Sequence, residues 1–107
     1  MSYIAMNRFR VVPGGEEQFE TIWRERESHL KKLPGFVEFR VLKGPEKDGY
    51  RLYSSHTLWK TEEDFQAWTR SEEFRAAHKN AGNRGTKDLL MGPPEFEGFQ
   101  TVLHETL

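Results

Sequence analysis

The N-terminal part of the chain alternates in side-chain character over residues 3–12. Such alternation is typical of a β-strand, in which successive side chains point to opposite faces of the sheet. Pro13 and the two glycines after it are expected to end this strand. One face would carry Tyr3, Ala5, Asn7, Phe9 and Val11, and the other Ile4, Met6, Arg8, Arg10 and Val12.

A helical period of three to four residues follows over residues 16–32. It predicts an amphipathic helix with acidic residues at its start and lysines at its end, as the helix dipole favours. Pro34 and Gly35 would stop the helix. One stripe of this helix would hold Phe19, Ile22, Trp23, Arg26, Leu30 and Leu33.

The remainder of the chain predicts three more strands and two short helices. Strands are expected at 36–43, 50–59 and 96–105, with a turn over 44–49 between the first two. Thr61 is a suitable N-cap with Asp64 in the capping-box position, so a helix should run to about residue 70. Ser71 is a second N-cap for a helix to about residue 80. The glycine- and proline-bearing stretch 82–94 predicts a long loop.

The order β-α-β-β-α-α-β predicts an α+β, ferredoxin-like fold with a four-stranded antiparallel sheet. With 107 residues, the chain has room for a single domain over residues 1–107. Helices would cover one face of the sheet and leave the face with Ile4, Met6 and Val12 bare. Two such sheets packed face to face would cover it, which predicts a homodimer of the dimeric α+β barrel type.

Composition narrows the possible functions. The net charge of −1 gives no basic field for nucleic acid, and the absence of cysteine excludes disulfides and thiolate ligands. No segment is long and apolar enough for a membrane span, and the first residues do not resemble a signal peptide, so a cytoplasmic location is expected. Aromatic residues make up 13% of the chain, and aromatic-lined pockets suit large flat ligands.

Three residues stand out as candidates for chemistry. Asn7 lies on an otherwise apolar strand face, where its amide needs hydrogen-bond partners. His78 lies on the apolar stripe of its predicted helix with Phe74 and Ala77, where a neutral imidazole could ligate a metal. Trp68 forms an i, i+3 aromatic pair with Phe65. Each also has a purely structural interpretation: an amide bound to a nearby backbone group, a satisfied core histidine and a packing tryptophan.

The other three histidines are weaker candidates. His29 lies off the stripe of its predicted helix, His56 is in the middle of a strand, and His104 is near the chain end. No pair of histidines has the close spacing of a protein-only zinc site. No phosphate-binding, dinucleotide or nucleophile-elbow motif is present.

Four segments together resemble a known family. They are Asn7-Arg8, Leu58-Trp59-Lys60, Phe65-Gln66-Ala67-Trp68 and Phe74-Arg75-Ala76-Ala77-His78-Lys79. The sequence from about residue 5 to residue 80 is similar to the IsdG-type haem-degrading monooxygenases of the antibiotic biosynthesis monooxygenase (ABM) superfamily. The tryptophan-containing segments indicate the superfamily fold, whereas the histidine segment with the N-terminal asparagine is more specific for haem.

The resemblance implies a catalytic and haem-binding triad of Asn7, Trp68 and His78. His78 would be the proximal ligand of the haem iron, and Asn7 would donate a hydrogen bond to oxygen on the other side. Trp68 would press the porphyrin out of plane and bring a ring carbon toward the oxygen. Haem would be both substrate and cofactor and would be opened with O2, releasing iron. Electrons would come from a separate reductase or other donor, because the chain has no flavin or nucleotide motif.

Two other functions remain compatible with the sequence. A cofactor-independent ABM-type oxygenase of an aromatic small molecule could use the same fold but would not need His78. A non-enzymatic haem carrier would keep His78 but release haem intact.

Overall fold

The computed structural model describes residues 2–26, 30–71, 74 and 86–107. Its elements are β1 (Tyr3–Val11), α1 (Glu16–Glu25), the 3-10 helix η1 (Leu30–Lys32), β2 (Phe36–Lys47), β3 (Tyr50–Trp59), α2 (Glu62–Thr69), the 3-10 helix η2 (Thr86–Leu89) and β4 (Glu95–Gln100). The predicted helix after Ser71 lies outside the described residues. Ser71 itself behaves as an N-cap, because the Phe74 N–H donates to its Oγ at 3.1 Å.

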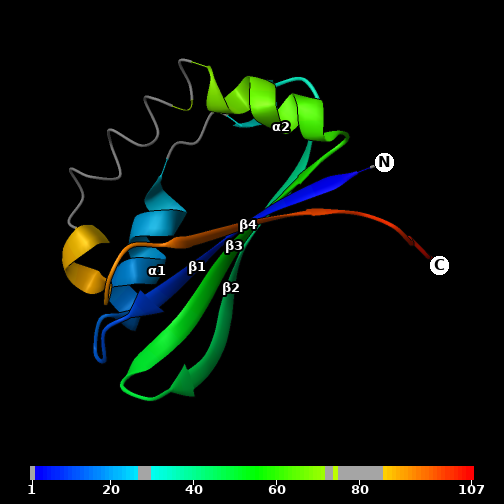
Figure 1. Ribbon diagram of the computed structural model, residues 1–107. Coiled ribbons are helices and arrows are strands. Elements are labelled where there is room, and N and C mark those ends of the chain that lie inside the picture. The colour runs from blue at the N-terminus through cyan, green and yellow to red at the C-terminus, as the bar shows by residue number, and fades with distance from the viewer. Residues whose placement is uncertain (1, 27–29, 72–73, 75–85) are drawn as a thin grey trace.

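The four strands form one antiparallel sheet in the order β2-β3-β1-β4. The two helices α1 and α2 lie toward opposite ends of this sheet (Figure 1). Side chains from both helices pack with the same face of β1, the one that carries Tyr3, Ala5, Phe9 and Val11. The predicted α+β, ferredoxin-like fold is therefore confirmed. No helix among the described residues is long and apolar enough to cross a membrane.

The predicted helix over 16–32 is too long. It ends at Glu25, because Arg26 adopts an extended backbone with ψ of 133°, and a separate 3-10 turn follows at Leu30–Lys32. Tertiary packing explains the break. Phe19 and Trp23 join the hydrophobic cluster at one end of the sheet, while Leu30 and Leu33 join the cluster at the other end. One straight helix could not place the residues of its apolar face in both clusters.

Three other boundaries differ from the prediction. β2 continues to Lys47 through a register shift between Lys43 and Glu46, so the turn is only Asp48-Gly49, with Gly49 at a φ of 81°. The predicted loop 82–94 contains η2, whose Leu89 is buried in the core. β4 ends at Gln100 rather than residue 105. Its last backbone bond is from the Thr101 N–H to the Ser2 carbonyl, beyond which β1 offers no partner.

The strand β1, the strand β3 and the helix α2 agree closely with the sequence pattern. Tyr50–Trp59 has the predicted bounds, and β1 differs from its prediction by one residue. Thr61 caps α2 as expected, because the Asp64 N–H donates to its Oγ1 at 3.1 Å. The Thr61 hydroxyl in turn donates to Asp64 Oδ2 at 3.0 Å, which fixes the start of this helix.

Candidate ligand site on the sheet

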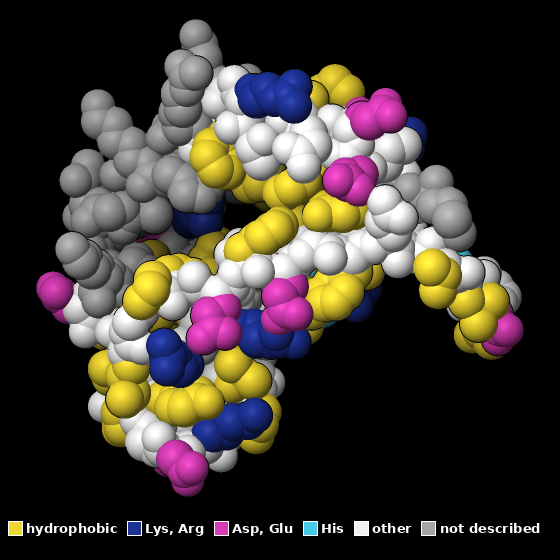
Figure 2. All heavy atoms as spheres, viewed as in Figure 1, with side chains coloured by type: hydrophobic (Ala, Val, Ile, Leu, Met, Phe, Trp, Pro, Cys, Tyr) yellow, Lys and Arg dark blue, Asp and Glu magenta, His cyan; other side chains and the backbone are white. Residues whose placement is uncertain are grey.

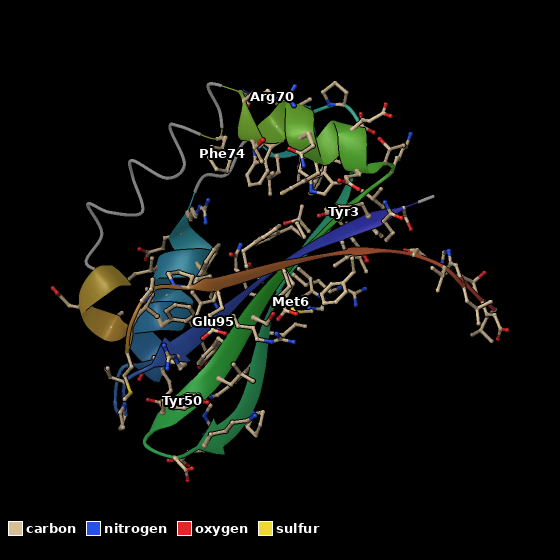
Figure 3. All side chains as sticks on the ribbon, in the orientation of Figure 1. Tyr3, Met6, Tyr50, Arg70, Phe74 and Glu95 are labelled. Carbon is tan, nitrogen blue, oxygen red and sulfur yellow. The ribbon has the colours of Figure 1, made fainter. Side chains whose placement is uncertain are left out.

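Two aromatic clusters occupy the ends of the helix-facing side of the sheet. The first is built around Trp59 and lies under α2, and the second is built around Phe19 and lies under α1. Figure 3 shows side chains of α2 directed toward the sheet near Tyr3. The buried members of the first cluster are Tyr3, Ala5, Leu30, Trp59 and Phe65; those of the second are Phe9, Val11, Phe19, Tyr53 and Leu89.

On the two central strands, small and polar side chains lie between the buried aromatic rings of the two clusters, and one of them, Ala5, also belongs to the first cluster. Asn7 of β1 pairs with Ser55 of β3, and Ala5 pairs with Thr57. Paired residues share a face, and their Cβ atoms lie roughly 4.5–5.5 Å apart. We call these four residues the central strip. Figure 2 shows the surface hollowed between α2 and the sheet, with hydrophobic side chains on the rim.

Asn7 is half-buried in the central strip. Its side-chain amide makes no hydrogen bond to any residue that the structure describes. The structural alternative, an amide bound to a nearby backbone group, is therefore not found in the described part of the chain. An amide in this position can donate to a ligand held over the strip.

Trp68 is firmly packed on α2. The centre of its ring lies 5.6 Å from that of Trp59, 6.1 Å from that of Phe65 and 4.8 Å from that of Phe74. It also lines a small cavity of about 160 Å³ with Leu33, Pro34, Asp64 and Ala67. Trp68 thus belongs to the cluster at one end of the strip and helps to hold α2 on the sheet. It faces the same side of the sheet as Asn7, from a different element.

His78 and His29 lie outside the described residues. His56 pairs with Met6 and Arg40, which places it on the sheet face that points away from the helices. His104 follows the last strand and is exposed. Where the structure describes the chain, no group of three or more His, Asp or Glu side chains is arranged to hold a metal ion. Neither His56 nor His104 can therefore serve the central strip as a ligand.

Ser55 and Thr57 are the site residues that the sequence reasoning missed. Both are buried, with exposed fractions of 4% and 6%, and their small side chains leave room above the middle of the sheet. The alternation of β3 contained the signal, because two small polar residues stand between Tyr53 and Trp59 on one face.

The neighbouring Tyr53 shows how this fold satisfies a buried hydroxyl elsewhere on the same strand. Tyr53 donates to Glu20 Oε2 at 2.5 Å, and Lys43 Nζ lies 3.4 Å from the same oxygen. Burial and the hydrogen bond to Glu20 raise the pKa of Tyr53 well above its ordinary value. The bond from Tyr53, followed by the one from Lys43, lowers the pKa of Glu20 despite partial desolvation. This network holds α1 to β2 and β3.

A second hollow lies between α2 and the end of β4. It has a volume of about 450 Å³ and is open, and it is lined by Thr61, Glu62, Glu63, Gln66, Arg70 and Gln100. A hydrogen bond from Gln100 Nε2 to Glu62 Oε1 at 2.9 Å crosses it. Its walls are polar, whereas a site for an apolar ligand needs mainly hydrophobic walls. The central strip is the better candidate for a large flat ligand.

The fold and the central strip define a ferredoxin-like α+β domain with a candidate ligand site between its sheet and its helices. Residues 2–80 match the family model described as antibiotic biosynthesis monooxygenase, and the chain belongs to this ABM family.

Curated relatives of the chain carry haem-related names. A heme-degrading monooxygenase from Bacillus thuringiensis (strain Al Hakam) is 38% identical over 62 residues, which are 58% of this chain and 56% of that protein. A staphylobilin-producing heme oxygenase from Staphylococcus haemolyticus (strain JCSC1435) is 31% identical over 78 residues, 73% of this chain and 74% of that protein. The match thus spans little more than half the length of the first of these relatives.

Solved structures extend the comparison to the whole chain. The heme-degrader MhuD from Mycobacterium tuberculosis, with two hemes bound in its active site, superposes with a TM-score of 0.73 at 25% identity and covers 97% of this chain and 99% of its own. SnoaB, a cofactor-independent oxygenase from Streptomyces nogalater, superposes with a TM-score of 0.65 at 22% identity, covering 99% and 96%. At 22% identity, the likeness to SnoaB shows a shared fold only.

Proposed function

We propose that this chain is a haem-degrading monooxygenase that binds haem between the sheet and its helices. The observation that carries the proposal is the central strip, where small side chains and an amide with no hydrogen bond to a described residue lie beside aromatic rings. A flat apolar ring fits over small side chains, and aromatic walls suit its faces and edges. The haem-related names of the relatives support the same substrate.

Each residue of the triad has a distinct role in this proposal. His78 would hold haem through its iron, with its second ring nitrogen free to donate to an acceptor that fixes the imidazole. Asn7 would face the bound haem from the sheet side, where its neutral amide would donate a hydrogen bond to oxygen. Trp68 would press on the macrocycle from α2. Its packing against Trp59 and Phe74 makes it a rigid support for that pressure.

When bound, haem supplies an iron centre that can react with O2 and external electrons. The protein contributes a water-poor, aromatic site in which a fixed donor is already oriented, so little reorganisation is needed during the reaction. The expected products are an open tetrapyrrole, free iron and a one-carbon fragment. The electrons come from a separate reductase or a chemical reductant.

The test is a turnover of hemin under air. Purified protein is titrated with hemin, ascorbate is added with catalase present to remove free peroxide, and the products are identified by mass spectrometry. A protein-induced Soret band that disappears with formation of an open tetrapyrrole supports the proposal. A stable Soret band under these conditions would point to a haem carrier, and no Soret band at all to a cofactor-independent oxygenase. Either outcome contradicts haem degradation by this chain.

A further inference from the structure

Residues 101–107, which follow β4 and which we call the arm, extend away from the sheet. Thr101 is still attached, because its N–H donates to the Ser2 carbonyl at 2.9 Å and its Oγ1 accepts from the Ser2 hydroxyl at 2.6 Å. Beyond it, no arm residue makes a hydrogen bond to a described part of the chain. Figure 1 shows the arm leaving the sheet, and Figure 2 shows its hydrophobic side chains projecting into solvent. Val102 is 85% exposed and Leu103 75%.

A free strand edge lies on the opposite side of the same sheet. β2 is an outer strand that pairs with β3, so half of its N–H and C=O groups point away from the sheet. Over residues 37–43 these outward groups have no backbone partner in the part of the chain that the structure describes. Val37 and Leu42 on this strand are 47% and 39% exposed. Pro45, which has no N–H, protects only the hairpin end of the edge.

The arm and this open edge have complementary requirements. An unpaired edge accepts an additional strand through its backbone, and the exposed aliphatic side chains of both segments gain by burial. Each segment has seven residues, which span roughly 23 Å when extended. The arm leaves the sheet from the β4 side, and β1 and β3 lie between it and the β2 edge of its own subunit. A second copy supplies both an arm and an edge, so a two-fold contact satisfies all four segments.

We propose that the arm adds as an extra strand to the open edge of β2 in a second copy of this chain, and that the exchange is reciprocal. The sequence predicts two sheets packed face to face; the arm specifies which strands join them at their margins. Val102 and Leu103 become buried in this arrangement, together with the exposed aliphatic residues of β2. The contact is made by the protein alone and does not depend on haem.

The first measurement locates the arm by photo-crosslinking. The residue p-benzoylphenylalanine is placed at position 103, where the exposed leucine leaves room for it, and the full-length protein is illuminated. We expect a covalent dimer in which mass spectrometry finds position 103 joined to residues 36–43 of the other chain. The control carries the same residue at position 48, in the exposed turn beyond Pro45, and should give no crosslink to residues 101–107.

The second measurement is the dimer affinity, followed by sedimentation over a range of concentrations. Leu103→Asp should weaken the dimer about tenfold or more, because it places a charge where an aliphatic side chain becomes buried. Its far-ultraviolet circular dichroism should be unchanged, since Leu103 is exposed in the single subunit. Gln18→Asp is the control: it adds the same charge at an exposed position of α1 and should dimerise as the unmodified protein does.

Three results would overturn the exchange of arms. One is a protein that sediments as a monomer at micromolar concentration. Another is a dimer in which position 103 crosslinks only outside β2, or not at all; the face-to-face packing of the sheets would then stand without the arm. The third is a Leu103→Asp dimer as tight as the unmodified one. None of these measurements uses hemin, so a failed haem turnover contradicts the proposed function and not this inference.

Discussion

An amide on an apolar sheet face has to be explained at the level of the single residue. Asn7 lies between Ala5 and Phe9 on the helix-facing side of β1, opposite Ser55. Since no described residue accepts or donates a hydrogen bond to its amide, its side chain is available for a ligand. The alternation of the strand was enough to predict which way Asn7 points.

The first prediction separates binding from chemistry at this residue. Asn7→Ala should retain hemin, because the proposed ligation of the iron by His78 would not depend on the amide. It should degrade hemin on the order of 100-fold more slowly, the usual effect of losing one positioned donor. The measurement is the Soret decay under ascorbate, air and catalase, after loading has been matched to the unmodified protein. Decay at the unmodified rate would remove Asn7 from the catalytic machinery.

The second prediction concerns the histidines. If His78 is the iron ligand as proposed, His78→Ala should lose the protein-induced Soret band while the far-ultraviolet circular dichroism stays near normal. His56→Ala is the control, because His56 is on the sheet face turned away from the helices. An unchanged haem spectrum in His78→Ala, or loss of the band in His56→Ala, would contradict the assignment.

Only part of the candidate site could be predicted from the sequence. Asn7 and Trp68 were accessible because a strand alternation and a helical pair each place one residue on one face. Ser55 and Thr57 were missed because their significance depends on being paired with Asn7 and Ala5, and pairing between distant strands is not written in a local pattern. The hydrogen bond of the Tyr53 hydroxyl to Glu20 on α1 is likewise tertiary.

At the level of elements, the sequence pattern predicted helix and strand boundaries well where an element is bounded by a clear local signal. The strands β1 and β3 and the capped helix α2 follow directly from alternation and from Thr61. The helix predicted over 16–32 was wrong because its stripe contained residues of two clusters, with Trp23 in one and Leu30 in the other. The overlong prediction for β4 failed for a similar reason, because a strand ends where its neighbour ends.

The third prediction tests the attachment of the helix α1 to the sheet. Because the pKa of Glu20 is lowered in the folded protein, its charged form stabilises the fold above the ordinary carboxyl pKa of 4.5, and this contribution is lost as pH falls through the lower folded-state value. Glu20→Gln should therefore have a lower denaturant midpoint than the unmodified protein at pH 7. The difference between the two midpoints should become smaller as the pH is lowered.

Chemical denaturation at a series of pH values from 7 down to 3 measures this effect. Glu17→Gln is the control, since Glu17 is exposed on the same helix and makes no side-chain hydrogen bond or ion pair to a described residue. Its curve should parallel that of the unmodified protein. If Glu20→Gln is as stable as the unmodified protein at pH 7, the contacts of Glu20 with Tyr53 and Lys43 do not stabilise the fold.

At the scale of the whole molecule, the uncovered face of the sheet is the main feature to account for. It carries the half-buried Ile4, Met6 and Leu58 together with Phe99, which is 41% exposed. Charged residues lie beside this patch on both outer strands. On β4, Glu97 pairs with Met6 in register and forms an ion pair with Arg8; on β2, Glu38 pairs with Leu58 and its Oε2 lies 3.5 Å from Arg40 Nη2. Met6 and Glu95 of this face are labelled in Figure 3. An apolar patch with a charged rim is typical of a protein interface.

The fourth prediction is a homodimer formed through this face. Sedimentation at micromolar concentration should give about twice the chain mass of 12.6 kDa. Phe99→Ser should shift the equilibrium toward the monomer, because it removes an exposed aromatic ring from the apolar patch. Phe96→Ser is the matched control: Phe96 is on the same strand but pairs with Asn7 on the helix-facing side, where it stacks on Phe65 at 5.6 Å.

The two variants test which face of the sheet forms the dimer. Both remove an exposed ring from β4, but Phe96 lies on the helix-facing side and Phe99 on the opposite side. Phe96→Ser should remain dimeric, although its loss of stacking on Phe65 should lower the melting temperature. Phe99→Ser should lower the dimer fraction at a given concentration while the isolated subunit keeps its secondary structure. If the unmodified protein is a folded, active monomer, the sheet face does not require a second copy, and the aromatic and charged residues on it must serve another partner.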